Sequence, residues 1–116
     1  MTTFTSYINQ MVYVEIDRPL NTRHPKYGFR YEVNYGYIPG TTNKDGEEID
    51  VYILGVSHPL KTFCGKCIAV IHRTNDNDDK LIVIPPEIKD IPDKEIKKQT
   101  YFQERFFESI VIRNKK

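Results

Sequence analysis

The stretch Asp45-Gly-Glu-Glu-Ile-Asp-Val-Tyr-Ile-Leu-Gly-Val56 places an acidic turn directly before an apolar, β-branched run. The run from Ile49 to Val56 predicts a β-strand, because β-branched and aromatic residues favour a pleated, half-buried surface. Similar patterns predict strands at 11–16, 66–72 and 80–84. The segments 43–46 and 75–79 are rich in Asn, Asp and Gly, which favour tight turns. A mainly β protein with short connections is therefore expected.

The C-terminal third changes to a helical period. Four apolar residues fall close to one face of a helix, and a Pro-Asp pair at 92–93 suits its first turn. We expect one helix of four or five turns that packs on the barrel or sheet, with a last short strand at 110–113. The four apolar residues are Ile96, Phe102, Phe106 and Ile110.

Length and charge exclude several classes of protein. The chain has 116 residues, which fits a single domain over 1–116, and its 17 Lys and Arg nearly balance 16 Asp and Glu. A net charge of +1 gives no general attraction for nucleic acid or membranes, so any anion site must be local. No apolar run approaches the roughly 20 residues of a membrane span, and residues 1–10 lack a signal-peptide pattern. We therefore expect a cytoplasmic protein.

The two cysteines form the C-x-x-C pair Cys64 and Cys67. This spacing occurs in redox pairs and in half of some zinc sites. A zinc site needs two more Cys or His residues at matching spacing, and the three histidines are scattered. The interpretation favoured here is a pair of ordinary thiols at a strand edge, in a reducing compartment.

The acidic turn is the main candidate for chemistry. It has four carboxylates in six residues, and positions 48 and 50 of the following strand project to the same face. A solvated turn whose acidic residues never meet explains the hexapeptide alone equally well. Asp50 is different, because it lies between Ile49 and Val51 in an apolar strand, where an unpaired buried charge is costly. A metal ion or a cationic partner would remove that cost, and Mg²⁺ prefers carboxylate oxygens.

Candidate phosphate ligands lie elsewhere in the chain. Basic residues occur in a Gly- and Pro-punctuated stretch and directly after the second acidic cluster, and tyrosines add hydroxyl donors. Each has an ordinary structural explanation, since surface Lys and Arg are usually just solvated and strand tyrosines usually belong to the core. Their combination favours an anion site. The candidates are Arg23, Lys26, Arg30, Lys80, Tyr31 and Tyr35.

Four segments follow one another along the chain: Val14-Glu-Ile16, Pro25-Lys-Tyr27, Tyr31-Glu-Val-Asn-Tyr-Gly-Tyr-Ile-Pro39 and Asp45-Gly-Glu-Glu-Ile-Asp-Val51. Together they resemble the soluble family I inorganic pyrophosphatases. In that family an N-Y-G-[FY]-I-P stretch is followed by the metal signature D-G-D-P-x-D, at the spacing found here. The resemblance covers roughly residues 12–85.

The resemblance implies an OB-type β-barrel with flanking helices and Mg²⁺-dependent hydrolysis of pyrophosphate, which is an inorganic diphosphatase activity. It implies a small-molecule phosphate substrate, and we expect no nucleic acid or membrane partner and a homo-oligomer. Glu47 matches the aspartate that helps to activate the attacking water, and Asp76 is the nearest substitute for an aspartate that aligns with Asn75. The implied metal ligands are Asp45, Asp50, Asp78 and Asp76, and the implied catalytic residues are Glu47, Lys26, Tyr35, Lys80 and Glu15.

The departures from the family pattern also matter. Four residues separate Lys26 from Tyr31, where the family carries a longer hairpin with a phosphate-binding arginine; Arg30 is the available stand-in. Gly28 replaces an acid, and Phe106-Phe107 align with a Tyr-Lys pair of phosphate ligands. The family aspartate at position 47 is Glu here, which adds one methylene. These changes predict weakened or altered activity.

Other functions stay open at this point. A metal- and phosphate-binding domain without catalysis, or a hydrolase of another phosphoanhydride, would retain the same acidic turn and lysines. A nucleic-acid-binding OB-type barrel is disfavoured by the neutral net charge and by the lack of a basic aromatic stripe.

Overall fold

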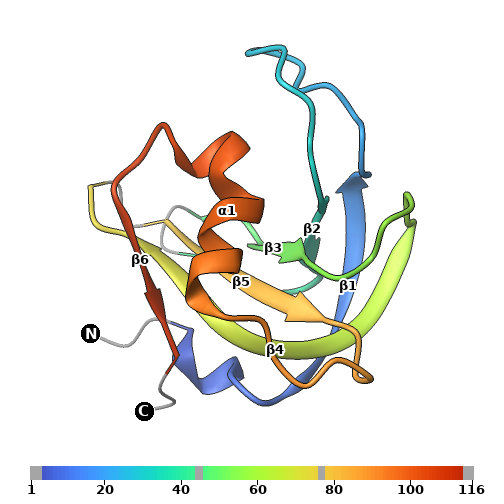
Figure 1. Cartoon of the computed structure of the whole chain (residues 1–116), viewed down its shortest axis with the longest axis vertical. Coiled ribbons are helices and arrows are strands. Elements are labelled where there is room, and N and C mark those ends of the chain that lie inside the picture. The colour runs from blue at the N-terminus through green and yellow to red at the C-terminus, as the bar shows by residue number, and fades with distance from the viewer. Residues whose placement is uncertain (1–3, 44–45, 76–77, 114–116) are drawn as a thin grey trace.

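The computed structural model describes residues 4–43, 46–75 and 78–113. Within these ranges the chain forms six strands, one α-helix and a short 3₁₀ turn, η1 at Thr5–Tyr7 (Figure 1). No described helix is long and apolar enough to cross a membrane. The strands are β1 Met11–Arg18, β2 Asn34–Ile38, β3 Ile49–Ile53, β4 Thr62–Arg73, β5 Asp79–Ile84 and β6 Ser109–Ile112, and the helix is α1 Asp93–Glu104.

Five of the strands close into a barrel. Their order is β1-β2-β3-β5-β4, and an additional pairing of β1 with β4 closes the ring. All pairs are antiparallel except β3 with β5. The twelve-residue strand β4 is long enough to pair with β1, β5 and β6 along different parts of its length. The expectation of a mainly β protein with a small closed barrel and one C-terminal helix is confirmed.

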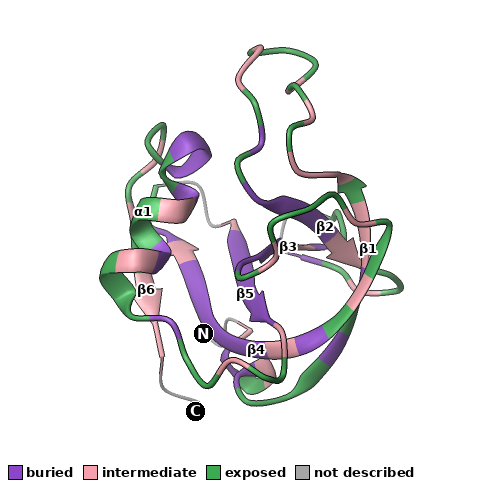
Figure 2. Cartoon of the chain, turned by 45° about the vertical axis from the view of Figure 1, so that its right-hand side comes forward, coloured by how far each residue is buried: buried purple, intermediate pink, exposed green. Residues whose placement is uncertain are grey.

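Two apolar clusters hold the barrel together. One fills the interior and includes Val14, Val51 and Leu81, while the other lies between the outer face of the barrel and α1 and includes Tyr52 and Phe102. Strand β5 contributes to both clusters and is buried along its whole length (Figure 2). A strand covered on both faces can be continuously apolar, as the sequence 81–84 is. The outer cluster fixes α1 beside the polar part of the barrel.

Gly36 allows β1 and β2 to approach closely. A Cβ atom at this position would lie 2.1 Å from the carbonyl oxygen of Glu15. Only glycine fits there without moving the neighbouring strand. A larger residue would push β1 away and displace Glu15 from its position opposite Tyr37.

Two predicted element boundaries are wrong. The strand expected to reach Val56 ends at Ile53, because Gly55 has a φ of +87° and turns the chain. The helix expected to include Phe106 and Ile110 ends at Glu104. The β-branched run 110–112 pairs with β4 instead, which confirms the last short strand. Strand β2 is not among those that the patterns predict.

Residues 19–33 form a protruding loop between β1 and β2, which we call the arm (Figure 1). A bridge between Arg23 and Arg30 pairs its two sides. The base of the arm is fixed to the helix, because the Tyr31 hydroxyl donates a hydrogen bond to Gln103 Oε1 at 3.0 Å. The arm thus projects from the barrel and is attached to α1 near its base.

Candidate active site

Four polar residues form a row across the outer face of the barrel. Glu15 of β1 lies opposite Tyr37 of β2, Tyr37 opposite Asp50 of β3, and Asp50 opposite Lys80 of β5. Residues directly opposite each other on neighbouring strands project to the same side. The structure therefore brings three of the predicted site residues, Glu15, Asp50 and Lys80, onto one face, and we call these four residues the polar row.

Lys80 is the cationic partner of Asp50. Its Nζ atom lies 2.7 Å from Asp50 Oδ2 and 2.9 Å from Asp78 Oδ2, and its side chain is only 4% exposed. Burial alone would lower the pKa of the Lys80 ammonium, but the charges of Asp50 and Asp78 outweigh this effect and raise its pKa. Lys80 is therefore charged at neutral pH, and the charge of Asp50 is compensated in the protein itself.

Asp78 is held by several donors. Its Oδ2 atom accepts hydrogen bonds from Lys80 at 2.9 Å and from Arg73 Nη1 at 3.3 Å, and Asn43 Nδ2 donates to Oδ1 at 3.0 Å. Burial raises the pKa of the Asp78 carboxyl, and the charges of Lys80 and Arg73 oppose this shift only in part. The carboxylate is fixed in position beside the polar row.

Arg73 and Glu104 form a buried ion pair behind Asp78. Arg73 Nε and Nη2 donate to the two carboxylate oxygens of Glu104 at 3.1 and 2.8 Å, and both side chains are nearly inaccessible. The Tyr52 hydroxyl also donates to Glu104 Oε2, at 2.6 Å. Sequence patterns miss this pair. Its one signal is Glu104 itself, which is eight residues after Ile96 and therefore on the buried stripe of the helix.

Asp17 is a second residue that the motifs miss. It lies on β1 at a break in the pairing register, where Ile16 is opposite Gly36 and Arg18 is opposite Tyr35 of β2. Shielding from water raises the pKa of the Asp17 carboxyl; Arg18 opposes the shift, and Asp50 and Glu48 add to it. Its spacing of two residues from Glu15 in the sequence is the signal that could have identified it.

Tyr35 lies beside the polar row on β2. Its ring is buried against Tyr52, with the ring centroids 5.0 Å apart, and Lys80 Nζ lies 5.6 Å from its centroid. Burial raises the pKa of the Tyr35 hydroxyl well above its ordinary value, and the charge of Asp50 adds to the shift. The phenol therefore stays protonated at neutral pH and can donate a hydrogen bond.

The remaining predicted residues lie at the periphery or cannot be placed. Lys26 is exposed on the arm, with Nζ 5.4 Å from the centroid of its neighbour Tyr27. Glu47 is exposed in the turn before β3, where its carbonyl oxygen accepts a hydrogen bond from the backbone of Asn43. The structure does not bring these two side chains into the polar row. Asp45 and Asp76 lie outside the described residues.

A divalent metal fits the chemistry of this face, although the described residues do not preassemble a site. Within 4–43, 46–75 and 78–113, no three His, Cys, Asp or Glu side chains form a ready metal-binding group. Glu15 and Asp50 nevertheless supply carboxylates on one face of the barrel, and Asp17 is near enough to Asp50 for that charge to raise its pKa. Oxygen donors of this kind suit Mg²⁺.

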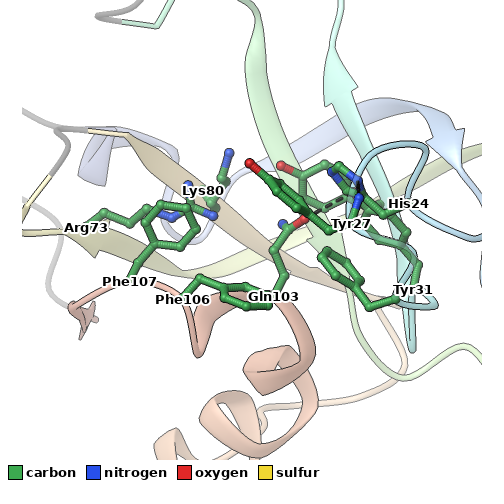
Figure 3. Close-up of a pocket in the computed structure, with 10 residues that line it drawn as sticks. His24, Tyr27, Tyr31, Arg73, Lys80, Gln103, Phe106 and Phe107 are labelled. Carbon is green, nitrogen blue, oxygen red and sulfur yellow. Dashed lines mark hydrogen bonds between the residues drawn. The ribbon is translucent and has the colours of Figure 1, made fainter.

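A pocket of about 400 Å³ opens between the arm and the end of α1, next to Lys80 (Figure 3). Lys80 and Arg73 lie toward one end of it, and His24 and Tyr31 toward the other. Most of its wall is aromatic. The lining residues are His24, Tyr27, Phe29, Tyr31, Tyr35, Arg73, Lys80, Gln103, Phe106 and Phe107.

Replacing both cysteines is expected to leave the chemistry unchanged. Cys64 is exposed and Cys67 is buried, and they are three positions apart along β4, which directs their side chains to opposite faces. Burial raises the pKa of the Cys67 thiol to about 12, so it carries little thiolate at neutral pH. Cys64→Ser with Cys67→Ala should keep activity and metal content within a few-fold and cost about 1 kcal/mol of stability. Loss of stoichiometric zinc from the variant would contradict this prediction.

Known sequences match most of this chain. A sequence model of the family "Inorganic pyrophosphatase" matches residues 9–112. The inorganic pyrophosphatase of Haemophilus influenzae is 36% identical over 67 residues, which cover 53% of this chain and 38% of that protein. That of Saccharolobus solfataricus is 28% identical over 110 residues, covering 82% of this chain and 61% of that protein. The chain thus spans less than two-thirds of the length of these relatives.

Solved structures are similar in fold. The crystal structure of inorganic pyrophosphatase from Ehrlichia chaffeensis superimposes with a TM-score of 0.69 at 20% identity, covering 88% of this chain and 84% of that one. The enzyme from Thermus thermophilus gives 0.63 at 20% identity, with coverages of 91% and 83%. Since the family model covers residues 9–112, from just before β1 to the end of β6, this chain belongs to the inorganic pyrophosphatase family.

Proposed function

We propose that this protein hydrolyses inorganic pyrophosphate to two phosphates with the help of Mg²⁺. We also propose that its departures from the family pattern lower the rate of this reaction. The observation that carries the proposal is the polar row, where acidic residues and a charged lysine lie on one face in a chain of the pyrophosphatase family. We also propose a cytoplasmic location and a homo-oligomeric state.

The metal-binding residues in this proposal are Asp50 and Asp78, together with Asp45 and Asp76 from the segments outside the described residues. Mg²⁺ bound there would lower the pKa of a coordinated water and offset charge on the phosphates. The alignment of carboxylates from neighbouring strands supports this assignment. Asp17 is added to the set as a further carboxylate, because the charge of Asp50 adds to the rise in its pKa.

The side chains of the protein bind and orient the substrate. The ammonium group of Lys80 is held in place by two carboxylates. This ammonium group can contact a phosphate oxygen. Tyr35 can donate a hydrogen bond to a second oxygen, and Lys26 can reach toward the substrate from the arm. Glu15, whose carboxylate accepts a hydrogen bond from Tyr37 at 3.1 Å, is the acidic residue at the far end of the polar row. Glu47 is the proposed acceptor of the proton from the attacking water.

Phosphate release from pyrophosphate, with Mg²⁺ and with a chelator, tests the proposal directly. Glu47→Gln should lower hydrolysis by about 100-fold, because an amide does not accept the proton. Glu47→Asp restores the family residue and should keep or raise the rate with pyrophosphate. A rate for Glu47→Gln equal to that of the wild type would remove Glu47 from the mechanism.

A metal- and phosphate-binding domain without catalysis is the second candidate. One observation favours it: Lys80 already neutralises two of the proposed metal ligands, Asp50 and Asp78. Calorimetry that detects Mg²⁺ and phosphate binding, with no phosphate release from pyrophosphate or other phosphoanhydrides, would support this candidate over the hydrolase.

A further inference from the structure

We propose that the aromatic pocket binds the base of a nucleoside triphosphate, whose phosphate chain extends to Lys80, so that the site accepts nucleotide phosphoanhydrides. This inference rests on the proposed function, because it assigns the hydrolase a substrate class. Water would attack the terminal phosphorus while the bridging P–O bond breaks. The nucleoside diphosphate would leave with the bonding electrons, and Glu47 would take the proton from the water.

Exposed aromatic rings are the first observation. Tyr27 is 65% exposed and Phe106 is 55% exposed, and their ring centroids lie 6.3 Å apart on the two sides of the pocket opening. His24 extends the aromatic surface, with its ring 4.9 Å from that of Tyr27. Large rings left in water gain free energy when a planar apolar surface covers them. A nucleobase has such a surface.

The size and character of the pocket are the second observation. Its volume of about 400 Å³ is within the roughly 300–1,000 Å³ typical of sites for drug-sized ligands. Pyrophosphate is small, entirely polar and highly charged, so it would leave most of the aromatic wall uncovered. A nucleoside attached to the phosphates would occupy the remaining space and contact the rings.

The placement of charge is the third observation. Lys80 and Arg73 lie toward one end of the pocket, away from His24 and Tyr31 (Figure 3). Lys80 has three N–H donors, of which Asp50 and Asp78 engage two. The Arg73 guanidinium lies 3.6 Å from the centroid of the Phe107 ring, so the charged groups contact the aromatic wall of the pocket. One end of the pocket thus has Lys80 and Arg73 with their carboxylate partners, where Lys80 keeps a donor for a phosphate oxygen, and the other end has aromatic rings for a base.

Binding of a slowly hydrolysed analogue tests the pocket independently of catalysis. The probes are adenosine triphosphate with a β,γ-imido bridge and inorganic tripolyphosphate, which has the same number of phosphates and no base. We expect the wild type to bind the imido analogue about 10-fold or more tightly than tripolyphosphate, because stacking of one base contributes roughly a factor of 5 to 150. Titration calorimetry with Mg²⁺ measures both affinities.

Matched variants assign the preference to the pocket. Tyr27→Ala with Phe106→Ala should lower the ratio of the two affinities by about 10-fold. Tyr101→Ala is the control, because Tyr101 is 63% exposed on α1 but does not line this pocket. The control should leave the ratio unchanged within about two-fold, as expected for a surface substitution. Circular dichroism verifies that each variant is folded.

The outcomes separate this inference from the proposed function. Equal affinity for the two probes, or an unchanged ratio in the double variant, would overturn the nucleotide pocket even if pyrophosphate is hydrolysed. Selective, variant-sensitive binding of the nucleotide without phosphate release from any substrate would overturn the hydrolase but leave the pocket in place. Selective binding together with release of phosphate from adenosine triphosphate would support both.

Discussion

Replacing Arg73 by methionine is expected to lower the free energy of unfolding by about 3–5 kcal/mol. The change leaves the buried carboxylate of Glu104 without its bidentate partner and removes one of the charges beside Asp78. A loss of this size is a large part of the roughly 5–15 kcal/mol by which domains are usually stable. Urea denaturation followed by circular dichroism measures it.

A double variant serves as the control for this prediction. Arg73→Met combined with Glu104→Leu removes both charges, and an apolar pair of similar volume is often as stable as the buried ion pair that it replaces. We expect the double variant to recover more than half of the stability lost in Arg73→Met. A single variant that loses less than about 1 kcal/mol would show that the ion pair contributes little.

Asp50→Asn is expected to weaken Mg²⁺ binding by more than about 100-fold and to lower pyrophosphate hydrolysis accordingly, since loss of even an indirect contact to a metal costs about 10- to 100-fold. The amide lacks the charge that attracts the cation and also leaves Lys80 with one fewer carboxylate. Titration calorimetry with Mg²⁺ and a phosphate-release assay measure the two effects.

Asp90→Asn is the matched control for the metal prediction. Asp90 undergoes the same chemical change, but it lies in the loop before α1, where it pairs with Arg113, and it belongs neither to the polar row nor to the lining of the pocket. The Asp90→Asn variant should bind Mg²⁺ with the affinity of the wild type. Unchanged Mg²⁺ binding in Asp50→Asn would remove Asp50 from the proposed metal site.

Local patterns in the sequence predicted most of the elements of the fold. The β-branched runs at 11–16 and 80–84 lie within β1 and β5, and the helical period around Ile96 lies within α1. The end of α1 was mispredicted because Phe106 and Ile110 fit the helical period, while pairing of 109–112 with β4 is a tertiary effect that periodicity does not contain. Strand β2 contains Gly36, and glycine is depleted in strands. The local sequence therefore does not predict this strand.

The candidate site was predicted in part, by motif. The motifs indicate Asp50 and Lys80 separately, and their ion pair depends on the parallel register of β3 with β5, which joins positions thirty residues apart. No local pattern gives that register. Arg73 was missed for the same reason, because it carries no motif and its partner Glu104 lies on the helix. Asp17 could have been found from its spacing of two residues from Glu15.

The long strand β4 has a consequence for how the chain folds. Closure of the barrel requires β1 to pair with β4, and the paired residues are about fifty positions apart in the sequence. Conformational entropy is therefore lost in closing a large loop before these contacts form. Proteins dominated by such distant pairings fold slowly, in milliseconds to seconds. The β4–β5 hairpin, by contrast, is local and buries apolar side chains on both faces. We therefore expect the hairpin to be structured in the transition state for folding and the β1–β4 seam to form last.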